Sequence, residues 1–135
     1  MESISSFEII KVGIGPSSSH TMGPWNAAEN FLKQLRTIRP IADVQEVFVE
    51  FFGSLAKTGI GHGTDIAGML GLSGEDFKLT NTSTIDEKIN KIKSSNEINL
   101  GGEKILPFVY GKHLILNKNK SLDFHPNGMI FRAVF

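Results

Sequence analysis

The sequence predicts an α/β (α+β) fold, a single domain with one central mixed sheet flanked by helices. Residues 44–52 alternate β-branched and aromatic side chains as strands do, and residues 28–35 carry apolar side chains at the spacing of one helix face. Strand-like and helix-like segments then follow one another without a regular βαβ rhythm. A length of 135 residues suffices for one domain with a sizeable core.

The first predicted elements are helical. Residues 6–10 are typical of a short capped turn of helix. A longer helix is expected from residue 21 or 23 to residue 36, where Pro24 fits in the first turn and Arg36 suits the C-terminal end of the dipole. The Arg-Pro pair at residues 39–40 ends this helix.

A strand and a second helix follow. Apolar and aromatic side chains occur on both faces of the strand at residues 44–52, so both faces are expected to be largely covered. The next helix begins at Thr64 or Asp65, either of which is suited to cap it. Gly71 is expected to end it.

The second half of the chain predicts one helix and three strands. Residues 84–87 have the pattern of a capping box and open a helix that runs to about residue 94. Residues 106–110 and 113–116 are expected to be strands joined through Gly111 and Lys112. Residues 129–135 alternate as a final strand, expected to lie close to an open edge or an exposed apolar patch.

The composition excludes several functional classes. Fourteen basic residues balance fourteen acidic ones, so no overall field favours nucleic acid or an anionic membrane surface. The sequence has no apolar run of about 18 residues and opens with no signal segment. It contains no cysteine, which excludes disulfides and thiolate-held metal centres within the chain. The default expectation is a cytoplasmic protein that binds neither nucleic acid nor membrane.

The motif at residues 13–24, GIGPSSSHTMGP, predicts a small-anion site. Its glycines permit close backbone approach, and the long helix begins directly after its hydroxyls. A helix N-terminus offers free N–H groups and the positive end of the dipole. One hydroxyl would suffice as a cap, whereas this motif supplies four hydroxyls and an imidazole: Ser17, Ser18, Ser19, Thr21 and His20.

A second motif repeats this arrangement. Residues 53–67, GSLAKTGIGHGTDIA, leave the predicted strand, turn at three glycines and enter the next helix just after His62. A single histidine near a turn, such as His113 or His125, is more often a surface residue. Two histidines on two similar loops favour convergence of His20 and His62 on one pocket.

Together with HPNGM at residues 125–129, these motifs resemble the β domain of iron–sulfur-dependent L-serine dehydratase (L-serine ammonia-lyase), and the resemblance spans nearly the whole chain. It implies a fold similar to the allosteric substrate-binding domain of phosphoglycerate dehydrogenase. It also implies conversion of L-serine to pyruvate and ammonium. A separate α domain or subunit would supply the cysteines of a [4Fe-4S] cluster, whose iron activates the serine hydroxyl.

The resemblance and the chemistry of the residues together suggest roles. Serine hydroxyls and helix N–H groups can hold a carboxylate without competing charge, and an imidazole can remove a proton near neutral pH. His20 and His62 are expected to act as acid/base or orienting residues, with the division between them left open. The other expected site residues are Ser17, Ser18, Ser19 and Thr21 on the carboxylate, Thr64 and Asp65 at the second helix start, and Asn127 closing the pocket.

The resemblance also sets expectations for what accompanies the chain. Residues 1–135 are expected to form the β domain, shortened at its C-terminus, without the cysteine-bearing α domain, so the isolated chain binds no cluster and is inactive. Its partners would be L-serine, the α domain or subunit, and further copies of the same enzyme. The alternative function is a non-catalytic regulatory module that binds serine or a similar small carboxylate.

Overall fold

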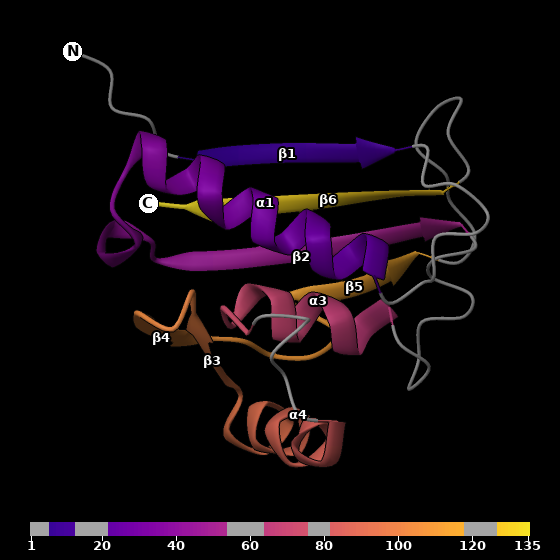
Figure 1. The fold of residues 1–135 in the computed structure, drawn as a ribbon. Helices are drawn as coiled ribbons and strands as arrows, with labels where there is room; N and C mark the ends of the chain where they lie inside the picture. Colours follow the sequence, from indigo (N-terminus) through magenta and orange to yellow (C-terminus); the bar gives the residue numbers. More distant parts are fainter. Residues whose placement is uncertain (1–5, 13–21, 54–63, 76–81, 118–126) are drawn as a thin grey trace.

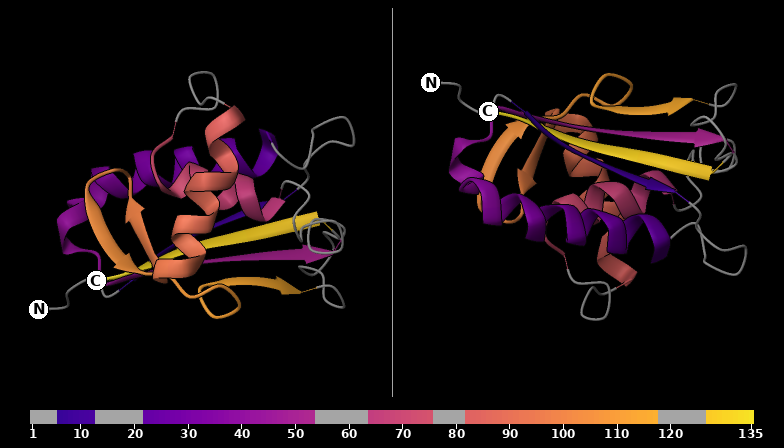
Figure 2. Two further views of the ribbon diagram at one scale, coloured as in Figure 1. Left: turned by 90° about the horizontal axis from the view of Figure 1, so that it is seen from below. Right: turned by 90° about the horizontal axis from the view of Figure 1, so that it is seen from above.

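A four-stranded mixed sheet with helices on one of its faces forms the body of the molecule (Figures 1 and 2). This computed structural model describes residues 6–12, 22–53, 64–75, 82–117 and 127–135. The expected α+β domain with one central mixed sheet is confirmed, and a separate two-stranded sheet lies beside the helices.

The strand order of the main sheet is β1-β6-β2-β5. β6 pairs antiparallel with both β1 and β2, and β2 pairs parallel with β5. Strands β1, β2 and β5 therefore run in one direction, and β6 runs against them. The bounds are β1 Ser6–Val12, β2 Glu46–Gly53, β5 Leu114–Asn117 and β6 Asn127–Val134.

Helix α1 (Met22–Ile38) lies across the sheet and confirms the predicted long helix. Its buried side chains recur at helical spacing, with Phe31 and Leu35 fully buried. The Phe31 ring stacks against both Phe7 of β1 and Phe131 of β6, with centroid distances of 5.9 Å and 5.5 Å. Burial of each such large side chain contributes about 1.5–3 kcal/mol, so this stack fixes α1 against two strands.

Helix α3 (Thr64–Leu72) packs closely against α1. A Cβ atom on Gly71 would lie 2.6 Å from the Ala28 Cβ and 3.0 Å from the Trp25 carbonyl oxygen, so glycine permits the close approach. The prediction that Gly71 ends the helix is wrong. Gly74, at φ +80°, follows the helix, and the N–H groups of Gly74 and Glu75 close the last turn on Gly71 and Leu70.

The remaining elements extend the helical layer. The 3-10 turn η1 (Ile41–Asp43) follows α1, and η2 (Thr82–Thr84) leads into α4 (Ile85–Ser95). The Thr84 side chain makes no capping hydrogen bond, so the predicted capping box does not form. Strands β3 (Glu97–Leu100) and β4 (Lys104–Pro107) pair as an antiparallel hairpin.

The two faces of β2 differ in burial. Val47, Val49 and Phe51 face the helices and are fully buried, together with Met129 and Phe131 of β6. On the opposite face Phe48 and Glu50 are partly exposed. The expectation that both faces are largely covered is confirmed for β2, since Phe52 on this second face is buried and neither Phe48 nor Glu50 is fully exposed, although the described helices lie on one side.

Two other sequence predictions fail, and two predicted strands form with partners that the sequence did not indicate. Residues 6–10 belong to a strand, β1, because they pair with β6. The predicted strands at residues 106–110 and 113–116 are present with shifted bounds as β4 and β5, which pair with β3 and β2, and a single isolated bridge joins Tyr110 to Leu114. The final strand lies inside the sheet rather than at an open edge. In each case distant pairing partners decided the outcome.

The contact at Gly71 generates a prediction about stability. Gly71→Ala should lower the free energy of unfolding by about 1–3 kcal/mol, because the added methyl group meets α1 backbone that cannot move aside without separating the helices. Urea denaturation monitored by circular dichroism measures the change.

Gly68→Ala in the same helix is the matched control. Its Cβ would meet only the edge of the Phe51 ring, at 3.0 Å, and it shares the gain in helix propensity. Equal stability of the Gly71→Ala variant and the unsubstituted chain would contradict the role given to the Gly71 contact.

Candidate functional site

One end of the sheet gathers the segments that carry all three motifs. Val12, Gly128, Phe52 and Asn117 form a single paired row across the four strands. β1, β2 and β5 end at or just beyond this row, and β6 begins there. We call this end the loop edge, defined by Val12, Gly53, Asn117 and Asn127, because residues 13–21, 54–63 and 118–126 attach at these four positions.

Two helices also begin at the loop edge. α1 starts at Met22, directly after Thr21, and α3 starts at Thr64, two residues after His62. Both N-terminal ends lie at the same end of the sheet as the last residues of β1 and β2 (Figure 1). The positive ends of two helix dipoles therefore face the same region, which favours an anionic group there.

The predicted site residues fall into three groups. Ser17, Ser18, Ser19, His20, Thr21 and His62 lie outside the described residues. Thr64 and Asn127 are described by their backbones, as the first residues of α3 and β6. Asp65 is described with its side chain, and it is buried.

The Asp65 carboxylate is held from two sides. Its Oδ1 accepts a hydrogen bond from the Ile66 N–H at 2.8 Å, and its Oδ2 accepts one from the Tyr110 hydroxyl at 2.7 Å. Its place in the first turn of α3 lets the helix dipole favour its negative charge. Burial, then the hydrogen bond to Asp65 and its charge, raise the pKa of Tyr110 above the ordinary range.

Tyr110 is the residue that sequence reasoning missed at this position. It lies 45 residues from Asp65 along the chain, in the segment that leads into β5. No spacing pattern links the two residues. The one available signal is that Tyr110 is the single tyrosine of the chain, which by itself predicts no partner.

His113 is buried, contrary to the prediction that it lies on the surface. Its ring stacks against Phe48 and Phe108 at centroid distances of 4.9 Å and 5.9 Å. Nδ1 accepts the Val109 N–H at 2.9 Å, so Nε2 carries the proton that it shares with Glu46 at 3.0 Å. This hydrogen bond lowers the pKa of Glu46. Because Glu46 opens β2 at the far end of the strand from Gly53, this cluster is separate from the loop edge.

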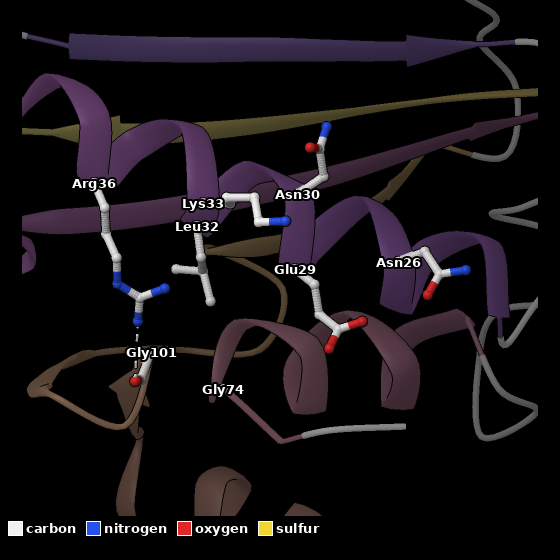
Figure 3. Close-up of a pocket in the computed structure, with 8 residues that line it drawn as sticks. All are labelled: Asn26, Glu29, Asn30, Leu32, Lys33, Arg36, Gly74 and Gly101. Carbon is white, nitrogen blue, oxygen red and sulfur yellow. Dashed lines mark hydrogen bonds between the residues drawn. The ribbon is translucent and has the colours of Figure 1, made fainter. Parts of the chain in front are cut away.

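A shallow polar groove runs beside α1 (Figure 3). Its volume is about 690 Å³. Arg36 reaches across it and donates hydrogen bonds to the Gly101 carbonyl oxygen at 3.3 Å and to Glu103 at 2.7 Å. The groove is lined by Asn26, Glu29, Asn30, Leu32, Lys33, Arg36, Gly74 and Gly101, none of which the motifs predict as site residues.

The described residues contain no group of three or more histidine, cysteine, aspartate and glutamate side chains able to hold a metal ion. The helices among these residues are also too short or too polar to cross a membrane.

The Asp65–Tyr110 pair predicts how the tyrosine titrates. Phenolate absorbance of this chain reports Tyr110 alone, and it should develop only well above pH 10, the ordinary value. Asp65→Asn should move the ionisation of Tyr110 to lower pH, because the neighbouring negative charge is gone.

The free energy of unfolding should depend on pH through the same ionisation. A raised pKa in the folded state means that the protonated tyrosine stabilises the fold fully below pH 10 and loses this contribution as pH rises further. The Tyr110→Phe variant should lack that loss. Ionisation of the unsubstituted chain near pH 10 would contradict the pairing.

Comparison with known proteins connects this geometry to a family. A family model for the serine dehydratase beta chain matches residues 5–135. L-serine dehydratase of Streptomyces coelicolor is 42% identical over 130 residues, which are 96% of this chain and 29% of that protein. L-serine dehydratase of Mycobacterium tuberculosis is 40% identical over 130 residues, with 96% and 28% covered. That of Haemophilus influenzae is 39% identical over 132 residues, with 97% and 29% covered.

The chain thus spans less than a third of the length of these relatives. Its match to the family model, in contrast, runs through nearly all of its residues, from before β1 to the end of the chain. The chain belongs to the serine dehydratase beta chain family.

Proposed function

We propose that this chain is the β part of an L-serine ammonia-lyase that converts L-serine to pyruvate and ammonia. The observation that carries the proposal is the loop edge, where three strand ends and two helix starts meet at the attachment points of all three motifs. The named activity of the relatives supports the choice of substrate. In this proposal the loop edge contributes one wall of the serine site, and the rest of the enzyme completes it.

The reaction defines what such a wall must do. In β-elimination a base removes the Cα proton, the electrons of the Cα–H bond form a Cα=Cβ double bond, and the hydroxyl takes up a proton from an acid and departs from Cβ as water. The resulting enamine takes up a proton to give an imine, and water then hydrolyses the imine to pyruvate and ammonia. The enzyme must hold the substrate carboxylate and place a base beside Cα.

The first motif suits the carboxylate. Its hydroxyls, Ser17, Ser18, Ser19 and Thr21, directly precede the N-terminus of α1 in sequence. Hydroxyl groups and free helix N–H groups donate hydrogen bonds to a carboxylate and add no negative charge of their own. In the proposal they orient L-serine through its carboxylate.

The two motif histidines suit the proton transfer. His20 precedes α1 by two positions, and His62 precedes α3 by two positions. An imidazole titrates near neutral pH, so either can accept the Cα proton while the other orients the substrate. In the proposal Thr64 and Asp65 fix the start of α3 beside the substrate, and Asn127 closes the site from the start of β6.

The chain does not supply the iron–sulfur cluster that the family resemblance implies. Such clusters are held by cysteine thiolates, and the sequence contains no cysteine. The residues present therefore do not fit a [4Fe-4S] cluster, and in the proposal the remaining part of the enzyme holds it.

Substitution of the two histidines tests the site. In the complete enzyme, His→Asn at the base should lower kcat by roughly 10²-fold or more and change KM little, because general base catalysis is lost while binding remains. The same substitution at the orienting histidine should mainly raise KM. Steady-state kinetics of His20→Asn and His62→Asn, with exchange of the serine Cα hydrogen in deuterated solvent, separates the roles.

His125→Asn is a matched control, since His125 also lies in a motif segment but is given no role in the reaction. Loss of Cα exchange should be confined to the variant that lacks the base. Normal turnover and exchange in both His20→Asn and His62→Asn, with unchanged circular dichroism, would show the site assignment to be wrong.

A second prediction concerns the isolated chain. Purified residues 1–135, incubated with iron and sulfide without oxygen, should bind no cluster and form no pyruvate from L-serine, because thiolate ligands are lacking. Iron analysis and a pyruvate assay measure both properties.

The control is the complete enzyme treated in the same way, which should bind iron and turn over. Serine binding without turnover in that complete enzyme would favour the alternative, a regulatory module for small carboxylates. Turnover by residues 1–135 alone would contradict the division of the enzyme into two parts.

A further inference from the structure

We infer that Tyr110 is a positioning residue for the reaction, acting through Asp65 on the start of α3. The inference rests on the proposed function and names a residue that lies outside all three motifs. The juxtaposition that carries it is the 2.7 Å hydrogen bond from the Tyr110 hydroxyl to a buried carboxylate in the first turn of α3.

The Asp65 carboxylate needs good hydrogen bonds where it lies. Its side chain is fully buried, and a buried charged group is costly unless donors satisfy its oxygens. The Ile66 N–H serves Oδ1 and Tyr110 serves Oδ2. Without the tyrosine hydroxyl, Oδ2 loses this donor. A shift of the first turn of α3 that exposes the carboxylate to water then becomes energetically favourable.

Tyr110 is well suited to fix that turn because its own backbone is fixed. The turn that contains it is closed by hydrogen bonds from the Lys112 and His113 N–H groups to the Val109 carbonyl oxygen, at 2.9 Å and 2.8 Å. The buried His113 ring holds the Val109 N–H and bonds to Glu46 of β2. The buried His113 ring thus fixes the position of the Tyr110 hydroxyl relative to the sheet.

The consequence reaches the loop edge through α3. Thr64 precedes Asp65 directly, and His62 lies two residues before Thr64. A fixed first turn of α3 therefore sets where the second motif joins the helix. Small displacements of a reacting group cost much activity, so a hydroxyl that touches no substrate can still control the rate.

A double-mutant cycle in the complete enzyme tests the inference. Tyr110→Phe removes only the hydroxyl and should lower kcat/KM for L-serine by roughly 10-fold or more, as expected for a lost hydrogen bond to a charged group. In an Asp65→Asn background the same substitution should change kcat/KM by less than about threefold, because its target is already altered.

Lys93→Met is the matched control. The Lys93 ammonium lies 4.7 Å from the centroid of the Tyr110 ring. It therefore contacts the ring face, whereas the Tyr110 hydroxyl bonds to Asp65. This variant should keep kcat/KM within about twofold of the unsubstituted enzyme. If Tyr110→Phe lowers kcat/KM equally in the unsubstituted and the Asp65→Asn backgrounds, Tyr110 does not act through the Asp65 carboxylate.

Amide hydrogen exchange adds a readout that does not need turnover. Tyr110→Phe should speed exchange in the first turn of α3, whereas Lys93→Met should not. If the unsubstituted complete enzyme fails to convert serine, the proposed function fails. Unchanged amide exchange in the first turn of α3 of the Tyr110→Phe variant would, independently, overturn the positioning role of Tyr110. If it converts serine and Tyr110→Phe is equally active, the inference fails while the proposed function stands.

Discussion

The structure depends on the pairing of one strand, β6, with two partners along their full lengths. β1 and β2 are joined by α1 and run parallel, yet they do not pair with each other, because β6 lies between them and runs the opposite way. Backbone groups of buried strands must find partners, so this insertion satisfies both inner edges at once. It also fixes direction: β1 and β2 must end on the same row, where β6 begins.

That constraint links packing to the candidate site. With β6 inserted, the Phe31 ring stacks on both Phe131 of β6 and Phe7 of β1. α1 is thereby held with its N-terminus at the end of the sheet where β1 and β2 end, and α3 packs against it through the close contact at Gly71. Two helix dipoles point at one region because two helices pack tightly side by side. The packing of the core thus determines where the positive ends of the two helix dipoles lie at the loop edge.

Polar groups complete this arrangement where apolar contacts cannot. The buried carboxylate of Asp65 and the buried ring of His113 each use hydrogen bonds from distant segments, and each ties the stretch before β5 to another element. Such pairs contribute little net stability compared with apolar burial, but they are costly to leave incomplete. Their effect is to tie the turn near Tyr110 to α3 and to β2.

Local patterns in the sequence predict α1, β2, α4 and β6 within a few residues, because periodicity and helix boundaries are properties of neighbouring residues. The motifs likewise predict which residues carry the chemistry. β1 is mistaken for a helical turn, and Tyr110 is missed, since the partner of each lies far along the chain. The sequence by itself determined the elements whose pattern is local, such as α1 and β2, and the candidate chemical groups. Only the tertiary structure decided which strand lies inside the sheet and which hydroxyl meets Asp65, because pairing between distant segments leaves no local periodic signal.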